Sequence, residues 1–144
     1  MTIRRILIHP DARLKKKATP VTEVTSSIEL LAEDMIDTMY DAPGIGLAAP
    51  QIGVMTRIFV MDCVKDEGEA PQIGVMTRIF VMDCVIDEGS APRPMVLMNP
   101  EITWASDEIS SYEEGCLSIP EQYGDVQRPT EVDMQWMGLD GQLH

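Results

Sequence analysis

The sequence predicts an α+β fold in which short antiparallel sheets pack around an amphipathic helix. Between Ser26 and Met39, apolar residues recur at three- and four-residue steps, a spacing typical of a helix with one buried face. The chain that follows contains short apolar runs separated by Gly and Pro, which favours several short strands. Because the strands follow the helix instead of alternating with further helices, βαβ units are not expected.

The predicted helix has signals at both ends. Ser26 followed by Glu29 matches a capping box, in which the two side chains satisfy N–H groups of the first turn. Pro43 marks the end of the helix. The strand candidates are the ranges 57–61, 95–98 and 131–137. Cys63 and Cys84 are candidates for buried strand positions.

Composition limits the kind of protein that this chain forms. Its 144 residues fit a single globular domain. With 24 acidic and 11 basic residues the net charge is −13, so no nucleic-acid partner is expected. Neither a run of transmembrane length nor a signal-peptide core is present, so we expect a cytoplasmic protein with no membrane partner. Three cysteines then favour reduced thiols over a disulfide framework.

One segment occurs twice. The ranges 50–64 and 71–85 both read PQIGVMTRIFVMDCV, and the likeness extends over 50–70 and 71–91. Solenoids need about three or more repeats, so this pattern favours a tandem duplication of 21 residues, an engineered insertion or an error in the sequence. Two identical strands compete for one position in a sheet. The strand that loses becomes an edge strand, a loop or a swapped element, and we expect self-association through an exposed or duplicated strand.

Two other segments contain candidate site residues. The range 44–53 reads GIGLAAPQIG, whose glycines let a ligand approach the backbone closely, and the range 113–120 reads EEGCLSIP. These motifs resemble the first and second signatures of the peptide deformylase family, and the likeness extends from RRILIHPDARLKKKA to VQRPTEVDMQWMGLDG. The resemblance implies a metallohydrolase of protein biosynthesis, which removes the formyl group from the N-terminal formyl-methionine of nascent polypeptides.

The resemblance also implies residue roles. Cys116 corresponds to a thiolate metal ligand, with Fe²⁺ as the usual metal and Zn²⁺, Ni²⁺ or Co²⁺ also accepted. Gln51 corresponds to the amide that donates to the formyl oxygen, and the N–H of Leu117 to a second donor for the same atom. The substrate groove corresponds to Gly44, Ile45 and Gly46.

Simpler interpretations of single residues stay open. A lone Cys is often a small buried hydrophobe, and Gln51 on its own could cap a turn, as its duplicate Gln72 is expected to do. Glu114 and Arg128 are expected to form an ion pair that supports the cysteine segment.

The third signature of the family, a helical His-Glu-x-x-His, has no match in this sequence. The only histidines are His9 and His144, and neither is followed by Glu-x-x-His. We therefore expect residues 1–144 to be a single domain of this kind, truncated before the family's C-terminal helix. We also expect exposed apolar strand faces, no stably bound metal and no activity of the chain alone.

Two alternative hypotheses belong to other functional classes. One is a catalytically inactive decoy that captures formyl-Met peptides without a metal. The other is an engineered or duplicated chain in which the repeat probes competition between strands during folding.

Overall fold

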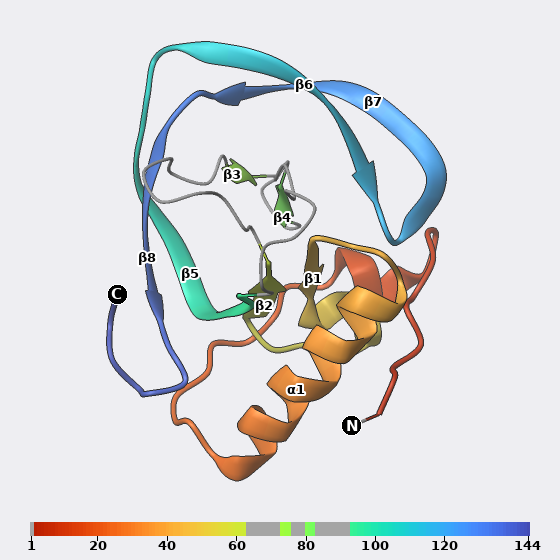
Figure 1. The fold of residues 1–144 in the computed structure, drawn as a ribbon, viewed down its shortest axis with the longest axis vertical. Coiled ribbons are helices and arrows are strands. Elements are labelled where there is room, and N and C mark those ends of the chain that lie inside the picture. The colour runs from red at the N-terminus through yellow and green to blue at the C-terminus, as the bar shows by residue number, and fades with distance from the viewer. Residues whose placement is uncertain (1, 63–72, 76–79, 83–92) are drawn as a thin grey trace.

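The computed structural model describes residues 2–62, 73–75, 80–82 and 93–144, and within them the predicted α+β architecture is confirmed (Figure 1). The helices are η1 (Ala12–Lys15), α1 (Ser26–Asp41) and η2 (Ala49–Ile52), of which η1 and η2 are short 3₁₀ helices. The strands are β1 (Gly46–Ala48), β2 (Ile58–Met61), β3 (Ile73–Val75), β4 (Phe80–Met82), β5 (Met95–Ala105), β6 (Ile109–Cys116), β7 (Ile119–Pro129) and β8 (Val132–Met137). No helix in the described ranges is long and apolar enough to cross a membrane.

Helix α1 confirms the predicted helix, but the predicted capping box is wrong. The N-cap is Thr25, whose carbonyl accepts from the N–H groups of Ile28 (2.8 Å) and Glu29 (3.1 Å), and no side chain caps the helix. Ser26 is already the first helical residue, so the Ser26 and Glu29 side chains are displaced by one position from the geometry of the box. The helix ends before Pro43, which cannot continue it.

The main sheet has the strand order β1-β2-β5-β8, and all its pairs are antiparallel. The predicted strands 57–61, 95–98 and 131–137 correspond to β2, β5 and β8. Successive side chains of β2 point to opposite faces. Ile58 and Val60 therefore pack with Met35 and Met39 of α1, whereas Phe59 and Met61 pack in a second core cluster.

The expectation of exposed apolar strand faces is wrong for the centre of the main sheet. Phe59, Met61 and Leu97 are each at most 2% exposed, because Ile45 and two residues of β8, Met134 and Trp136, cover this face. Apolar side chains are exposed, as expected, near the end of β5 and on the hairpin formed by β6 and β7. They include Trp104 of β5, Ile109 of β6 and Tyr123 of β7.

The two copies of the repeated sequence lie in different sheets. The first copy supplies β2, between β1 and β5, while β3 and β4 of the second copy pair with each other in a separate two-stranded sheet. Strand β4 lies close to β1 and β6, and β3 lies close to β7 (Figure 1). Cys63 and Cys84, the two predicted strand cysteines, lie outside the described residues.

A contact between distant segments ties the chain before α1 to β5. Asn99 has a positive φ of 52°, a conformation that asparagine tolerates better than most residues. Its side-chain amide donates to the Val21 carbonyl and accepts from the Val21 N–H, both at 2.8 Å. Val21 is therefore held at the edge of the core next to α1.

Candidate functional site

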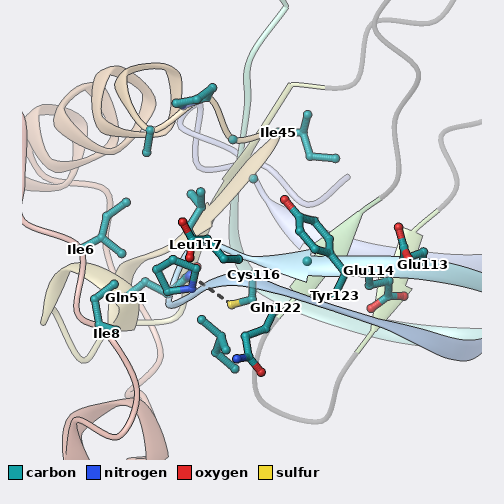
Figure 2. Close-up of a pocket in the computed structure, with 18 residues that line it drawn as sticks. Ile6, Ile8, Ile45, Gln51, Glu113, Glu114, Cys116, Leu117, Gln122 and Tyr123 are labelled. Atoms are coloured by element: carbon teal, nitrogen blue, oxygen red, sulfur yellow. Dashed lines mark hydrogen bonds between the residues drawn. The ribbon is translucent and has the colours of Figure 1, made fainter.

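A pocket of about 600 Å³ lies where the N-terminal segment, the β1 region and the end of the β6–β7 hairpin meet (Figure 2). All six predicted site residues line it, although they come from two segments far apart in the sequence. They are Gly44, Ile45, Gly46, Gln51, Cys116 and Leu117. The structure therefore brings the predicted residues together, and their chemical roles stay predictions.

The Gln51 amide is held in one orientation beside the cysteine. Gln51 is only 3% exposed, and its Oε1 accepts from the Ala48 N–H at 2.9 Å. Its Nε2 donates to Ser118 Oγ at 3.1 Å and lies 3.8 Å from Cys116 Sγ (Figure 2). With the oxygen end bound to the backbone, the nitrogen end faces the cysteine, so this side chain presents a donor at that position.

The backbone conformation around η2 turns Gln51 inward. Pro50 occupies the start of the 3₁₀ helix, where its fixed φ suits a helical turn. Gly53 ends the helix with φ of 83°, and its N–H returns to the carbonyls of Ala49 and Pro50. Such a left-handed cap strongly favours glycine, so the sharp end of η2 depends on residue 53.

Glycines bring the two signature segments into contact. A Cβ atom at Gly44 would lie 2.7 Å from Cδ1 of Leu117, and one at Gly46 would lie 2.8 Å from Cζ of Phe59. On the hairpin, a Cβ atom at Gly115 would lie 2.9 Å from Cε1 of Tyr123. Close packing therefore disfavours a side chain at Gly46, where Phe59 is buried, more than at Gly115, where Tyr123 is 71% exposed and has room to move.

A buried ion pair supports the strand that ends at Cys116. The Arg128 guanidinium binds the Glu114 carboxylate at two points, with Nε–Oε1 at 2.9 Å and Nη2–Oε2 at 2.8 Å. The two side chains are 10% and 8% exposed, respectively. This confirms the expected pair and makes it a buried, two-point contact between β6 and β7, a stronger arrangement than a surface pair.

The N-terminal segment also belongs to the site, which sequence reasoning missed. The Leu7 N–H donates to the Gln51 carbonyl at 2.7 Å, and the His9 N–H donates to the Ser118 carbonyl at 2.8 Å. The side chains of Ile6 and Ile8 line the pocket, whereas Leu7 is buried. The short apolar run at 6–8 was the available signal, and its alternation fits a segment with one side on the pocket.

The described residues do not fit a complete metal centre. Among them there is no group of three or more His, Cys, Asp or Glu side chains that could hold a metal ion. The His9 side chain is exposed, and His144 lies beside Asp140 at 3.2 Å and stacks on Trp136 with ring centroids 5.7 Å apart. Cys116 is therefore a single candidate ligand in this part of the chain.

Comparison with known proteins identifies the family. The profile described as polypeptide deformylase matches residues 3–69 and 70–144, and the two matches meet one residue before the second copy begins. A peptide deformylase of Afipia carboxidovorans is 47% identical over 144 residues, which are 100% of this chain and 71% of that protein. One from Rhodopseudomonas palustris strain TIE-1 is 46% identical over 143 residues, which are 99% and 70%.

Solved structures agree with the sequence matches. The peptide deformylase of Ehrlichia chaffeensis in complex with actinonin has a TM-score of 0.81 and 31% identity, and the match covers 100% of this chain and 73% of that one. The peptide deformylase of Legionella pneumophila has a TM-score of 0.77 and 38% identity, with coverage of 99% and 70%. Fold and matches together define a hydrolase. The chain belongs to the polypeptide deformylase family, which is metal-dependent.

Proposed function

We propose that the pocket is a deformylase site that recognises the N-terminal formyl-methionine of nascent polypeptides. The observation that carries the proposal is the Gln51 amide, which is locked with its Nε2 3.8 Å from Cys116 Sγ in a pocket with apolar walls. A formyl group needs a hydrogen-bond donor at its oxygen, and a methionine side chain needs apolar surface. The pocket has both, because Ile6, Ile8 and Ile45 line it together with Gln51.

The remaining pocket residues suit the same substrate. Strand β1 lies at the end of the strand order of the main sheet, so a peptide backbone can add alongside its Gly46 end like a further strand. The N–H of Leu117 is the second proposed donor to the formyl oxygen, and fixed donors of this kind stabilise negative charge that develops there during hydrolysis. A role in processing nascent chains also implies a cytoplasmic location.

We infer that residues 1–144 alone neither hold a metal stably nor hydrolyse the formyl group. Fe²⁺ is the metal that the resemblance implies, with Zn²⁺, Ni²⁺ or Co²⁺ as substitutes. Hydrolytic metal sites generally need three protein ligands and an open position. The pocket offers Cys116 and three glutamates, but Glu114 is paired with Arg128, and no three such side chains among the described residues are grouped so that they could hold a metal ion.

The test of this inference is formate release from a formyl-Met-Ala-Ser tripeptide. The purified chain is assayed anaerobically with Fe²⁺ or Ni²⁺, with Cys116→Ala as the matched control. We expect no release above that of the control. Release that depends on Cys116 would contradict the inferred inactivity, and it would show that further ligands reach the pocket.

A second candidate function is metal-free capture of formyl-Met peptides, without turnover. The observation that favours it is that Gln51, Leu117 and the isoleucines, the residues proposed to contact the formyl group and the methionine side chain, line one pocket. Isothermal titration with formyl-Met-Ala-Ser tests it. We expect binding that Gln51→Glu abolishes and that Gln72→Glu, the same substitution in the second copy, leaves unchanged. Absence of binding by the unmodified chain would reject this function.

We also propose that the ranges 50–70 and 71–91 arose by tandem duplication. The near-identity of the two ranges supports this origin, as does the division of the family match at residues 69 and 70.

A further inference from the structure

Gln51 can serve as a donor in the pocket only if its amide stays in one orientation. A rotation of the amide by half a turn would exchange the oxygen and nitrogen ends, and the oxygen would repel a formyl oxygen. The Ala48 N–H holds the Oε1 end at 2.9 Å. This single contact leaves the opposite end of the side chain to be fixed by another group.

Ser118 provides the contact at the nitrogen end. Its Oγ accepts from Gln51 Nε2 at 3.1 Å, and the residue is only 1% exposed. Ser118 is not among the residues that line the pocket, so it does not contact a ligand there directly. An Nε2 group has two hydrogens. With one hydrogen directed to Ser118, the other is directed to Cys116 Sγ at 3.8 Å, on the side of the pocket.

The backbone bridge from the N-terminal segment holds both partners of this bond. Leu7 and His9 are two residues apart, and in an extended segment the N–H groups of such residues point to the same side. They donate to the carbonyls of Gln51 and Ser118, respectively, at 2.7 and 2.8 Å. The Gln51–Ser118 hydrogen bond is therefore closed by main-chain bonds that fix both residues relative to one segment.

We propose that Ser118 is a positioning residue that sets the orientation of the Gln51 amide, and thereby the preference of the pocket for a formyl group. This inference rests on the proposed function of the pocket. It requires that loss of the Ser118 acceptor weakens recognition of the formyl group more than recognition of the rest of the peptide.

The experiment compares two ligands by isothermal titration, with metal-free protein. One ligand is formyl-Met-Ala-Ser, and the other is its desamino analogue, which has no formamide group and no charge at that end. The ratio of the two affinities measures formyl recognition separately from peptide binding. Since a neutral hydrogen bond contributes about 1 kcal/mol, we expect Ser118→Ala to lower the ratio by roughly fivefold to tenfold.

Two further variants keep the test interpretable. Ser118→Cys fills nearly the same space with a weaker acceptor, so its ratio should fall between those of the unmodified chain and Ser118→Ala. It decides the question if the alanine variant does not fold. Ser111→Ala removes an exposed hydroxyl from β6, the strand that leads into the turn containing Ser118, and should leave the ratio unchanged.

The outcomes separate the two proposals. If the unmodified chain shows no preference for the formyl peptide, the proposed function of the pocket is wrong. If it shows the preference and both Ser118 variants retain it in full, the positioning role of Ser118 is wrong. A graded loss in the order Ser, Cys, Ala, with Ser111→Ala unaffected, supports the role.

Discussion

Two copies of the same fifteen residues differ in structure where both copies are described, at residues 52–54 against 73–75 and 59–61 against 80–82. In the first copy, Ile52 ends the 3₁₀ helix η2 and Gly53 is left-handed, with φ of 83°. In the second copy, the equivalent residues belong to strand β3, where Gly74 pairs with Val81. Likewise, β2 lies inside the main sheet between two neighbours, whereas its equivalent β4 pairs with β3. Identical sequence therefore does not decide the structure here.

The residues that precede each copy explain the difference. The first copy follows β1, and the Ala48 N–H there donates to Gln51 Oε1 at 2.9 Å. The second copy has Glu69 at the position equivalent to Ala48, and Glu67 where the first has Gly46. The turn at η2 is therefore specified by contacts with its neighbours, because its own propensities permit a strand equally well.

The largest expected difference between the copies concerns the equivalent methionines Met61 and Met82. Met61 is 1% exposed in the main sheet, so Met61→Ala should lower the free energy of unfolding by about 2–5 kcal/mol. Met82→Ala, the same change in β4, should cost less than about 1 kcal/mol, because a two-stranded sheet contributes little stability by itself. Urea unfolding measures both.

Equal losses in the two variants would contradict the assignment of the first copy to the main sheet. A small loss in Met61→Ala that becomes large in the double variant would show that the second copy replaces the first when the first is weakened.

A smaller difference is expected between the glycines. Gly53→Ala places a Cβ on a left-handed residue and should cost about 1–2 kcal/mol. Gly74→Ala lies in a strand and should be neutral or stabilising by up to about 1 kcal/mol, because alanine loses less backbone entropy than glycine. Thermal unfolding of the two variants provides the measurement, and a stabilised Gly53→Ala would exclude the left-handed turn.

The smallest expected effect is a change in the titration of Tyr40. Partial burial, followed by the hydrogen bond from its hydroxyl to the Asp62 carboxylate, raises the pKa of Tyr40 to about 12. Asp62→Asn should lower this pKa toward the ordinary value, and Asp83→Asn in the second copy should not change it. Absorbance titration at alkaline pH, with Tyr40→Phe as the reference, distinguishes the two carboxylates.

The sign of the linked effect on stability follows from the raised pKa. The folded state keeps the Tyr40 proton at a pH where the unfolded state releases it. The contribution of Tyr40 to the free energy of unfolding is therefore complete below pH 10 and is lost as the pH rises from 10 to about 12. Stability that rises over this interval relative to Tyr40→Phe would contradict the assignment.

Much of the fold was predictable because the buried elements have regular patterns. Helix α1 has a clear apolar face, and β2 is a continuous buried run. The hairpin formed by β6 and β7 was not predicted as strands, since most of its residues are exposed and no alternation of apolar residues marks it. The prediction of the capping box was wrong because Thr25, Ser26 and Ser27 are all residue types that suit an N-cap position, and the helix begins after the first of them.

The site was predictable to the extent that side chains define it. The residues of the two signature segments meet in one pocket, and Glu114 and Arg128 pair as expected. The contribution of Leu7 and His9 was not predictable, because main-chain N–H groups make their contacts and any residue type other than proline offers the same donor. Ser118 lies within a recognised segment, but its acceptor role depends on a partner 67 residues away.

The bond between Asn99 and Val21 explains how the fold accommodates the second copy. The two residues are 78 positions apart, and 21 of these positions correspond to the repeat period. The entropic cost of closing a flexible loop grows only with the logarithm of its length. The additional residues therefore raise the free energy of closing this loop by about 0.3 kcal/mol. Long-range contacts that enclose the repeated block are thus almost insensitive to its length, and the block is a region where insertions carry little thermodynamic penalty.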